Sequence, residues 1–250
     1  MKRIYLPVSA ALSALTLGST LMIADANPLA LKFYNSGARK YKQGDYQGAI
    51  SDYSKALELN PKDLDTLDNL GAAKYQLGDY QGAIAEAEKA LEINPQHAYA
   101  LNNRGVSRWK LKDYQGAIGD YSKAIAINPE YADAYSNLCA AKFDLKDYQG
   151  AIADCDKAIE FDPQDAVAYS NRGALKNALQ DYQGAVADYK KAIAINPKYG
   201  LAYSNLGISK YYLTGDSESS CIDFKKSASL GYQYRINWLN SEEGQWCRDM

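Results

Sequence analysis

Apolar, small and polar residues recur along this chain in one pattern that returns at a fixed interval. The stretch Asp-Tyr-Gln-Gly-Ala-Ile begins at Asp45, Asp79, Asp113 and Asp147, and a near copy ending in Val begins at Asp181. Each copy starts 34 residues after the one before it. A fixed period of this length is typical of a solenoid, in which each unit buries its apolar face only against its neighbours.

Each repeat predicts two helices with defined ends. The first helix runs to the residues before Asp-Tyr, and the Asp caps the second helix by accepting a backbone N–H from its first turn. An Asn-Pro or Asp-Pro pair ends the second helix, because Asn tolerates the left-handed conformation and Pro cannot continue a helix. The predicted capping residues are Asp45, Asp79, Asp113, Asp147, Asp181 and Asp216. The predicted ends are Asn60-Pro61, Asn94-Pro95, Asn128-Pro129, Asp162-Pro163 and Asn196-Pro197.

Small and large side chains alternate at the predicted helix crossings, as close packing requires. Small residues let the two helices approach, and large residues fill the space around them. The small set in the first helix is Gly37, Gly71, Gly105, Gly173 and Gly207. The large set in the second helix is Tyr53, Tyr121, Tyr189 and Phe224.

A 34-residue helix–turn–helix unit with these residues at these offsets resembles the tetratricopeptide repeat. The resemblance extends from about Ala30 to Gly231 and implies an all-α, right-handed solenoid of six units with a capping helix. The expected units are residues 30–63, 64–97, 98–131, 132–165, 166–199 and an irregular sixth over 200–231. Residues 27–29 are expected to be a short lead-in, and residues 232–250 a capping helix and tail.

The amino terminus has the composition of a secretory signal. Met1-Lys2-Arg3 is basic, the stretch from Ile4 to Ile23 carries no charge, and Ala24-Asp25-Ala26 is a small-x-small site. We therefore predict a signal peptide over residues 1–26, cleaved before Asn27, and export to a periplasm, a lumenal space or the medium. The alternative is a retained anchor, because about 20 apolar residues can span a bilayer. Membrane contact is expected only in that case.

The charge balance argues against a nucleic-acid partner. The 28 basic and 30 acidic residues nearly cancel, whereas nucleic-acid binding needs a strongly basic face. The single histidine, His97, leaves little material for a metal centre or a catalytic relay, and it is expected to be a solvated loop residue. No phosphate loop or nucleophile elbow occurs. We expect a protein without enzymatic activity, cofactor or metal.

Charged residues recur at fixed offsets and allow two interpretations. One is a charged stripe that binds a partner. The other, which we favour, is local pairing between the two helices of a unit and along the second helix. The basic set is Lys40, Lys74, Arg108, Lys142, Lys176 and Lys210. The acidic set is Asp52, Glu86, Asp120, Asp154, Asp188 and Asp223.

An asparagine recurs at one offset of the first helix in all six units. An Asn amide can both donate to and accept from a peptide backbone. In solenoids of the resembled family, a ladder of such residues on the inner face holds an extended peptide. The alternative is recent duplication, because Gln47 and its equivalents are also invariant without an evident task. The predicted ladder is Asn35, Asn69, Asn103, Asn137, Asn171 and Asn205.

Aromatic residues recur late in the first helix, near the expected inner side. They either stack on a ligand or pack between adjacent units, and the sequence does not decide between the two. The set is Tyr41, Tyr75, Trp109, Phe143 and Tyr211.

All four cysteines lie in the part of the chain that is expected to be exported, where disulfides persist. Cys221 and Cys247 are predicted to pair, which would fix the tail over the cap. Cys139 and Cys155 take offsets that face each other across one unit, and they either pair or remain small buried fillers.

These features together predict a non-enzymatic scaffold. It would bind an extended peptide or a protein partner of unknown identity on its concave face, for example as an assembly factor. The alternatives are a self-associating or membrane-tethered structural module and a non-catalytic subunit of a larger complex. The basic clamp with which some members of the resembled family hold a terminal carboxylate is not present, because its offsets carry residues such as Tyr34, Asp65 and Tyr99. Arg104 and Arg172 are expected to face neighbouring helices.

Overall fold

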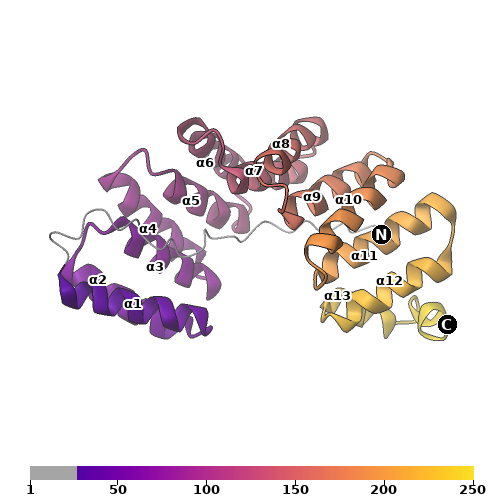
Figure 1. Ribbon diagram of the computed structural model, residues 1–250, viewed down its shortest axis with the longest axis horizontal. Helices are drawn as coiled ribbons and strands as arrows, with labels where there is room; N and C mark the ends of the chain where they lie inside the picture. Colours follow the sequence, from indigo (N-terminus) through magenta and orange to yellow (C-terminus); the bar gives the residue numbers. More distant parts are fainter. Residues whose placement is uncertain (1–26) are drawn as a thin grey trace. The chain divides into compact units, whose positions relative to one another are not determined.

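The computed structural model describes residues 27–250, so the predicted signal peptide lies outside the described residues. Every regular element in this range is a helix, as the repeat pattern predicts. The helices fall into two compact units, residues 27–134 and residues 135–250 (Figure 1). None of the helices between residues 27 and 250 is long and apolar enough to cross a bilayer.

The first unit contains three helix pairs, in which each helix packs against the next along the chain (Figure 1). The first helices of the pairs are α1 (Pro28–Lys42), α3 (Leu64–Gln76) and α5 (Ala98–Lys110). The second helices are α2 (Tyr46–Leu59), α4 (Tyr80–Ile93) and α6 (Tyr114–Ile127). The first helices of successive pairs also touch each other, α1 with α3 and α3 with α5.

The second unit continues the same pairing to the carboxyl terminus. Its first helices are α7 (Ala132–Asp144), which contains the division between the units, α9 (Ala166–Ala178) and α11 (Gly200–Thr214). Its second helices are α8 (Tyr148–Phe161), α10 (Tyr182–Ile195) and α12 (Ser217–Ser229). The short helices α13 (Gln233–Leu239) and α14 (Gln245–Arg248) both pack against α12. The predicted capping helix is thus present as α13.

The predicted helix caps are confirmed in all six pairs. Each capping Asp accepts a hydrogen bond from the backbone N–H three residues later, at 2.8–3.0 Å. The second helices of the first five pairs end at the residue before the expected Asn or Asp. Such caps satisfy backbone groups that would otherwise lack partners at a helix end.

The turn between the two helices of each pair needs one residue in the left-handed conformation. Glycine fills this position in three pairs, with φ of 80° at Gly44, 80° at Gly78 and 71° at Gly215. The other three pairs force a residue with a side chain into the same conformation: Lys112, Lys146 and Gln180, at φ of 65–66°. These three turns therefore carry backbone strain that a glycine would not.

The small residues at the helix crossings allow the close approach that the sequence predicts. A Cβ on Gly105 would lie 2.6 Å from Cε1 of Tyr121, closer than any real contact allows. The Tyr121 ring is completely buried because it lies over this glycine. Ala117 and Ala124 on the same helix are also fully buried, so α5 and α6 pack without a gap.

Two segments differ from expectation. Helix α1 begins at Pro28, inside the predicted lead-in, because Asn27 accepts a hydrogen bond from the Leu29 backbone at 3.0 Å and proline suits the first helical position. The predicted tail contains helix α14, in which Cys247 is fully buried against α12. Cys247 and Trp246, whose ring centroid lies 6.0 Å from that of Trp238, give this segment its apolar contacts.

Candidate functional site

The predicted asparagine ladder lies on the first helices, and we call the surface that these helices form in each unit its first-helix face. In the unit of residues 27–134, Asn35 is exposed, and Asn69 and Asn103 are half-buried. Asn69 Nδ2 donates a hydrogen bond of 3.1 Å to Tyr34 Oη on the preceding first helix. This contact gives Asn69 a role in joining two repeats.

In the unit of residues 135–250 the ladder is buried. Asn137, Asn171 and Asn205 are at most 1% exposed. Asn171 Nδ2 lies 3.5 Å from the Ser136 backbone oxygen of the preceding first helix, and Asn205 hydrogen bonds to the phenol of Tyr189. These amides serve packing between helices, so in this unit the ladder does not present its side chains to solvent.

Two ladder residues keep a buried acceptor without a donor. Asn103 Oδ1 and Asn171 Oδ1 are shielded from solvent, and no hydrogen bond to either atom occurs among residues 27–250. A buried polar atom that lacks a partner costs about 1–3 kcal/mol. Native structures seldom keep such atoms, and those that remain often mark a site for a ligand or water.

The predicted aromatic set packs inside its own repeat. Four of its members contact the tyrosine that opens the second helix of the same pair, with ring centroids 5.2–6.5 Å apart. Tyr211 instead contacts Tyr212 and is 45% exposed. The main ring contact of these four residues is therefore within the repeat, and packing between adjacent repeats, one of the two alternatives, is not their main contact. The rings support the turn of their own unit and leave chiefly Tyr211 available for stacking.

The recurring charges pair locally, as the favoured interpretation predicts. In every repeat the basic residue of the first helix forms an ion pair with the acidic residue of the second helix, at 2.5–2.8 Å. Five of the six acids have side chains at most 9% exposed, and that of Asp154 is 13% exposed. Pairing along the second helix is less regular, since between residues 27 and 250 the recurring acid pairs with the lysine three residues later only in Glu86 and Lys89, and Lys157 pairs instead with Glu160. The interpretation as a partner-binding stripe is therefore disfavoured.

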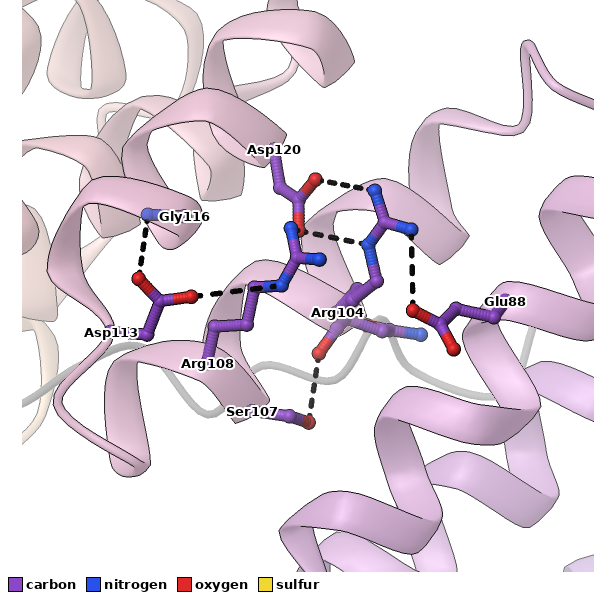
Figure 2. Close-up of polar contacts among 8 residues, drawn as sticks. Glu88, Arg104, Ser107, Arg108, Asp113, Gly116 and Asp120 are labelled. Carbon is purple, nitrogen blue, oxygen red and sulfur yellow. Dashed lines mark hydrogen bonds and ion pairs between the residues drawn. The ribbon is translucent and has the colours of Figure 1, made fainter.

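Arg104 extends this pairing across three helices, as Figure 2 shows. Its Nε and Nη2 donate to the two oxygens of Asp120 on α6, at 3.0 and 2.7 Å. Its Nη1 lies 3.9 Å from Glu88 Oε1 on α4. Arg108 donates a further 2.7 Å bond to Asp120, whose side chain is 2% exposed. The hydrogen bond to Asp120 raises the pKa of Arg104 despite its burial, so the guanidinium stays charged.

Arg172 repeats the arrangement in the other unit. It donates to both oxygens of Asp188 on α10, at 3.0 and 2.7 Å, and its Nη1 donates to Asp156 on α8 at 2.7 Å. Arg104 and Arg172 therefore face neighbouring helices, as expected, and each joins two repeats. Both are structural and unavailable to a carboxylate ligand.

His97 departs from the expectation of a solvated loop residue, which is wrong. Its Nε2 lies 2.7 Å from Asp68 Oδ2, and its side chain is only 15% exposed. Burial lowers the pKa of His97, but the hydrogen bond to Asp68 and the charges of Asp68 and Asp65 outweigh it, so that the pKa is raised. The one sequence feature that could have indicated this contact is the pair Asp65 and Asp68 in the first turns of α3.

The four cysteines form two disulfides. Cys139 pairs with Cys155 and Cys221 with Cys247, with the Cα atoms of each pair 5.4 Å apart. The first joins α7 to α8, and the second joins α12 to α14. Between residues 27 and 250 no group of three or more His, Cys, Asp and Glu side chains is arranged to hold a metal ion.

Family comparisons identify the repeats. Residues 37–78 match a family described as TPR repeat, and residues 69–132 match one described as tetratricopeptide repeat. Residues 132–165 and 166–199 each match a further tetratricopeptide repeat family. A comparison with curated proteins found no match.

Solved structures show the same fold. A tetratricopeptide repeat protein from Parabacteroides merdae is 26% identical, with a TM-score of 0.71 over 86% of this chain and 85% of that one. MamA is 30% identical, with a TM-score of 0.55 over 65% of this chain and 95% of that one. The pilF protein of Pseudomonas aeruginosa is 21% identical, with a TM-score of 0.69 over 88% of this chain and 97% of that one.

The helix pairs, their 34-residue period and these matches agree with one another. The architecture is that of a protein–protein interaction scaffold, and the chain belongs to the tetratricopeptide repeat family.

Proposed function

We propose that this protein holds an extended segment of a protein partner on a first-helix face. The observation that carries the proposal is the buried Oδ1 of Asn103, which has no hydrogen-bond donor among residues 27–250. A peptide backbone N–H is the donor that such an oxygen lacks. Asn35 and Asn69 lie on the same face and are at least partly exposed, so they can take part in the same contact.

The spacing of the helices suits an extended peptide. Packed helices lie about 8–10 Å apart, and an extended chain advances about 3.3 Å per residue. Ladder residues of adjacent repeats therefore meet every third peptide residue. The three repeats of residues 27–134 would hold a segment of about 7–9 residues by this spacing.

The test is a substitution with a matched control in the same repeat. Asn103→Ala removes the free acceptor, and Gln115→Ala removes an exposed amide on α6. One amide contact contributes about 0.5–1.5 kcal/mol, so Asn103→Ala should weaken binding about 2- to 10-fold and Gln115→Ala should not. The measurement is the Kd of a partner captured from the native envelope fraction. Equal affinities for the wild-type and Asn103→Ala proteins would refute a peptide contact at this residue.

Export is part of the proposed function, and the two disulfides support it because they persist in oxidising compartments. Asn27, the predicted first residue of the mature protein, is also the cap of α1. We expect the intact mass of protein from its native compartment to correspond to residues 27–250. A mass that includes residues 1–26 would indicate a retained anchor.

Self-association is a second candidate, because leucines recur at the turns between paired helices and stay exposed. Leu77, Leu111, Leu145 and Leu179 are 49%, 41%, 39% and 42% exposed. Light scattering at increasing concentration separates the two functions, since a peptide-binding scaffold remains monomeric and a self-associating module does not.

A further inference from the structure

Acidic and aromatic side chains gather on the first-helix face of residues 27–134. Asp65 and Asp68 lie in the first turns of α3, and the His97 imidazole contacts Asp68 at 2.7 Å. The Tyr99 ring lies 6.1 Å from the His97 ring, centroid to centroid. Tyr34 on α1 is close enough to Asp65 and Asp68 for both carboxylates to raise the pKa of its phenol, although burial is the larger cause. We call these five residues the acidic–aromatic patch.

The patch carries negative charge that the described residues do not balance. The recurring acids on the second helices of this unit, Asp52, Glu86 and Asp120, each pair with a lysine or arginine. Asp65 and Asp68 have no lysine or arginine partner between residues 27 and 250, and His97 is the sole cation paired with Asp68 in that range. Asp68 Oδ1 is buried and receives no hydrogen bond from residues 27–250. This oxygen lacks a donor as Asn103 Oδ1 does.

No ion pair between residues 27 and 250 balances the charge of Asp65, whose side chain is exposed. Partial burial raises its pKa, and the charges of Asp63 and Asp68 raise it further, while His97 lowers it. A positively charged group from outside the chain would favour the ionised form of this carboxylate.

The aromatic rings select among possible cations. Tyr99 is 38% exposed and lies beside His97. The face of its ring can therefore contact a side-chain cation, and its hydroxyl can form hydrogen bonds with a peptide. A bound metal ion is disfavoured, because the described residues include no suitable group of three ligands. Lysine and arginine have both the charge for the carboxylates and an apolar stem for the rings.

We propose that the acidic–aromatic patch recognises a lysine or arginine side chain of the extended segment that the first-helix face binds. The inference rests on the proposed peptide-binding function and names the charge of its ligand. Asp65, whose side chain is exposed, accepts a hydrogen bond from the incoming cation, Asp68 supplies the second carboxylate, and Tyr99 contacts the stem.

The experiment uses three labelled 12-residue peptides of glycine and serine, in which four positions are lysine, acetyl-lysine or glutamate. Binding to the protein comprising residues 27–250 is measured by fluorescence anisotropy at low salt. We expect the lysine peptide to bind about 5- to 20-fold more tightly than the acetyl-lysine peptide, and the glutamate peptide to bind most weakly. The preference should shrink at high salt, where exposed charges are screened.

The decisive variant is Asp65→Asn with Asp68→Asn, and its control is Glu58→Gln with Glu92→Gln. The control removes the same net charge from exposed positions on the second helices. We expect the first variant to reduce lysine-peptide binding about 5- to 20-fold and the control to change it less than 2-fold. Equal losses in both variants would show attraction to net charge alone and would overturn the proposal.

Two further readouts distinguish the possible failures. A purely structural role predicts that Asp65→Asn lowers the melting temperature, whereas the proposed role predicts an unchanged or higher one together with weaker binding. If a captured partner binds the Asp65→Asn, Asp68→Asn protein as tightly as wild type but loses affinity with Asn103→Ala, this inference fails and the peptide-binding function stands. If neither variant affects the partner, both fail.

Discussion

Replacing Arg104 by methionine tests whether the charged residues that join repeats are worth more than ordinary surface pairs. Arg104 donates two hydrogen bonds to Asp120, whose side chain is 2% exposed, and approaches Glu88 at 3.9 Å (Figure 2). Methionine keeps the apolar stem and removes the charge. The substitution therefore leaves Arg108 as the one remaining ion-pair partner of the buried Asp120 carboxylate between residues 27 and 250.

The size of the effect follows from these contacts. Removing one partner of a buried ion pair costs about 3–5 kcal/mol when the other charge is left alone. Arg108 keeps Asp120 partly compensated, so we expect a loss of about 2–3 kcal/mol. The contact with Glu88, which is 50% exposed, is worth at most about 0.5 kcal/mol, and Glu88→Gln is the matched control.

Urea unfolding followed by circular dichroism measures both variants. At about 2–4 °C per kcal/mol for a chain of this length, Arg104→Met should also lower the melting temperature by about 4–12 °C. A loss below about 0.5 kcal/mol, equal to that of Glu88→Gln, would show that the buried pair acts like an exposed one and would refute the reasoning. Because repeats can unfold separately, a lowered m-value would indicate that the repeats no longer unfold in one cooperative step.

Three other substitutions test the turns, the carboxyl terminus and the histidine. Lys112→Gly should stabilise the protein by about 0.5–1 kcal/mol in urea unfolding, because the φ of 66° at this residue costs a side chain more than a glycine; no gain would mean that the turn is unstrained. Cys221→Ser should cost about 3 kcal/mol and increase hydrogen exchange in α14, because the bond to Cys247 closes a loop of 26 residues; unchanged exchange would mean that packing alone holds the segment. The raised pKa of His97 means that its protonated form stabilises the fold, so its contribution is full below about pH 6.5 and is lost as the pH rises through the folded pKa. Wild type should therefore lose its stability advantage over His97→Gln as the pH rises above about 6.5, and a constant difference would contradict the contact with Asp68.

The sequence was sufficient to predict features that involve residues at fixed positions within a single repeat. The capping Asp residues, the ends of the second helices and the pairing of Lys40 with Asp52 all involve residues that a single unit supplies. A fixed period repeats such a local contact unchanged. The offsets of Cys139 and Cys155 placed them face to face in one helix pair but left open whether they pair, and the structure shows that they form a disulfide.

Features that involve neighbouring repeats were less predictable, because they depend on which residue the neighbour supplies. Asp68 and His97 are 29 residues apart and occupy positions that differ in the other repeats, so no recurrence indicated their contact. The helical conformation of α14 was not predicted, although the disulfide that joins this segment to α12 was.

The asparagine ladder shows why an invariant offset does not imply an invariant role. Asn69 contacts Tyr34, whereas Asn171 contacts the backbone of Ser136, although both asparagines occupy the same position in their repeats. The difference comes from the residue one helix earlier, which is large in one case and small in the other. The positions that vary between repeats thus determine which amides are free for a ligand. Under the proposed function, partner selection would depend on variable residues such as Asp65, Asp68 and Tyr99, while the exposed and half-buried asparagines of residues 27–134 would supply contacts that any peptide backbone can make.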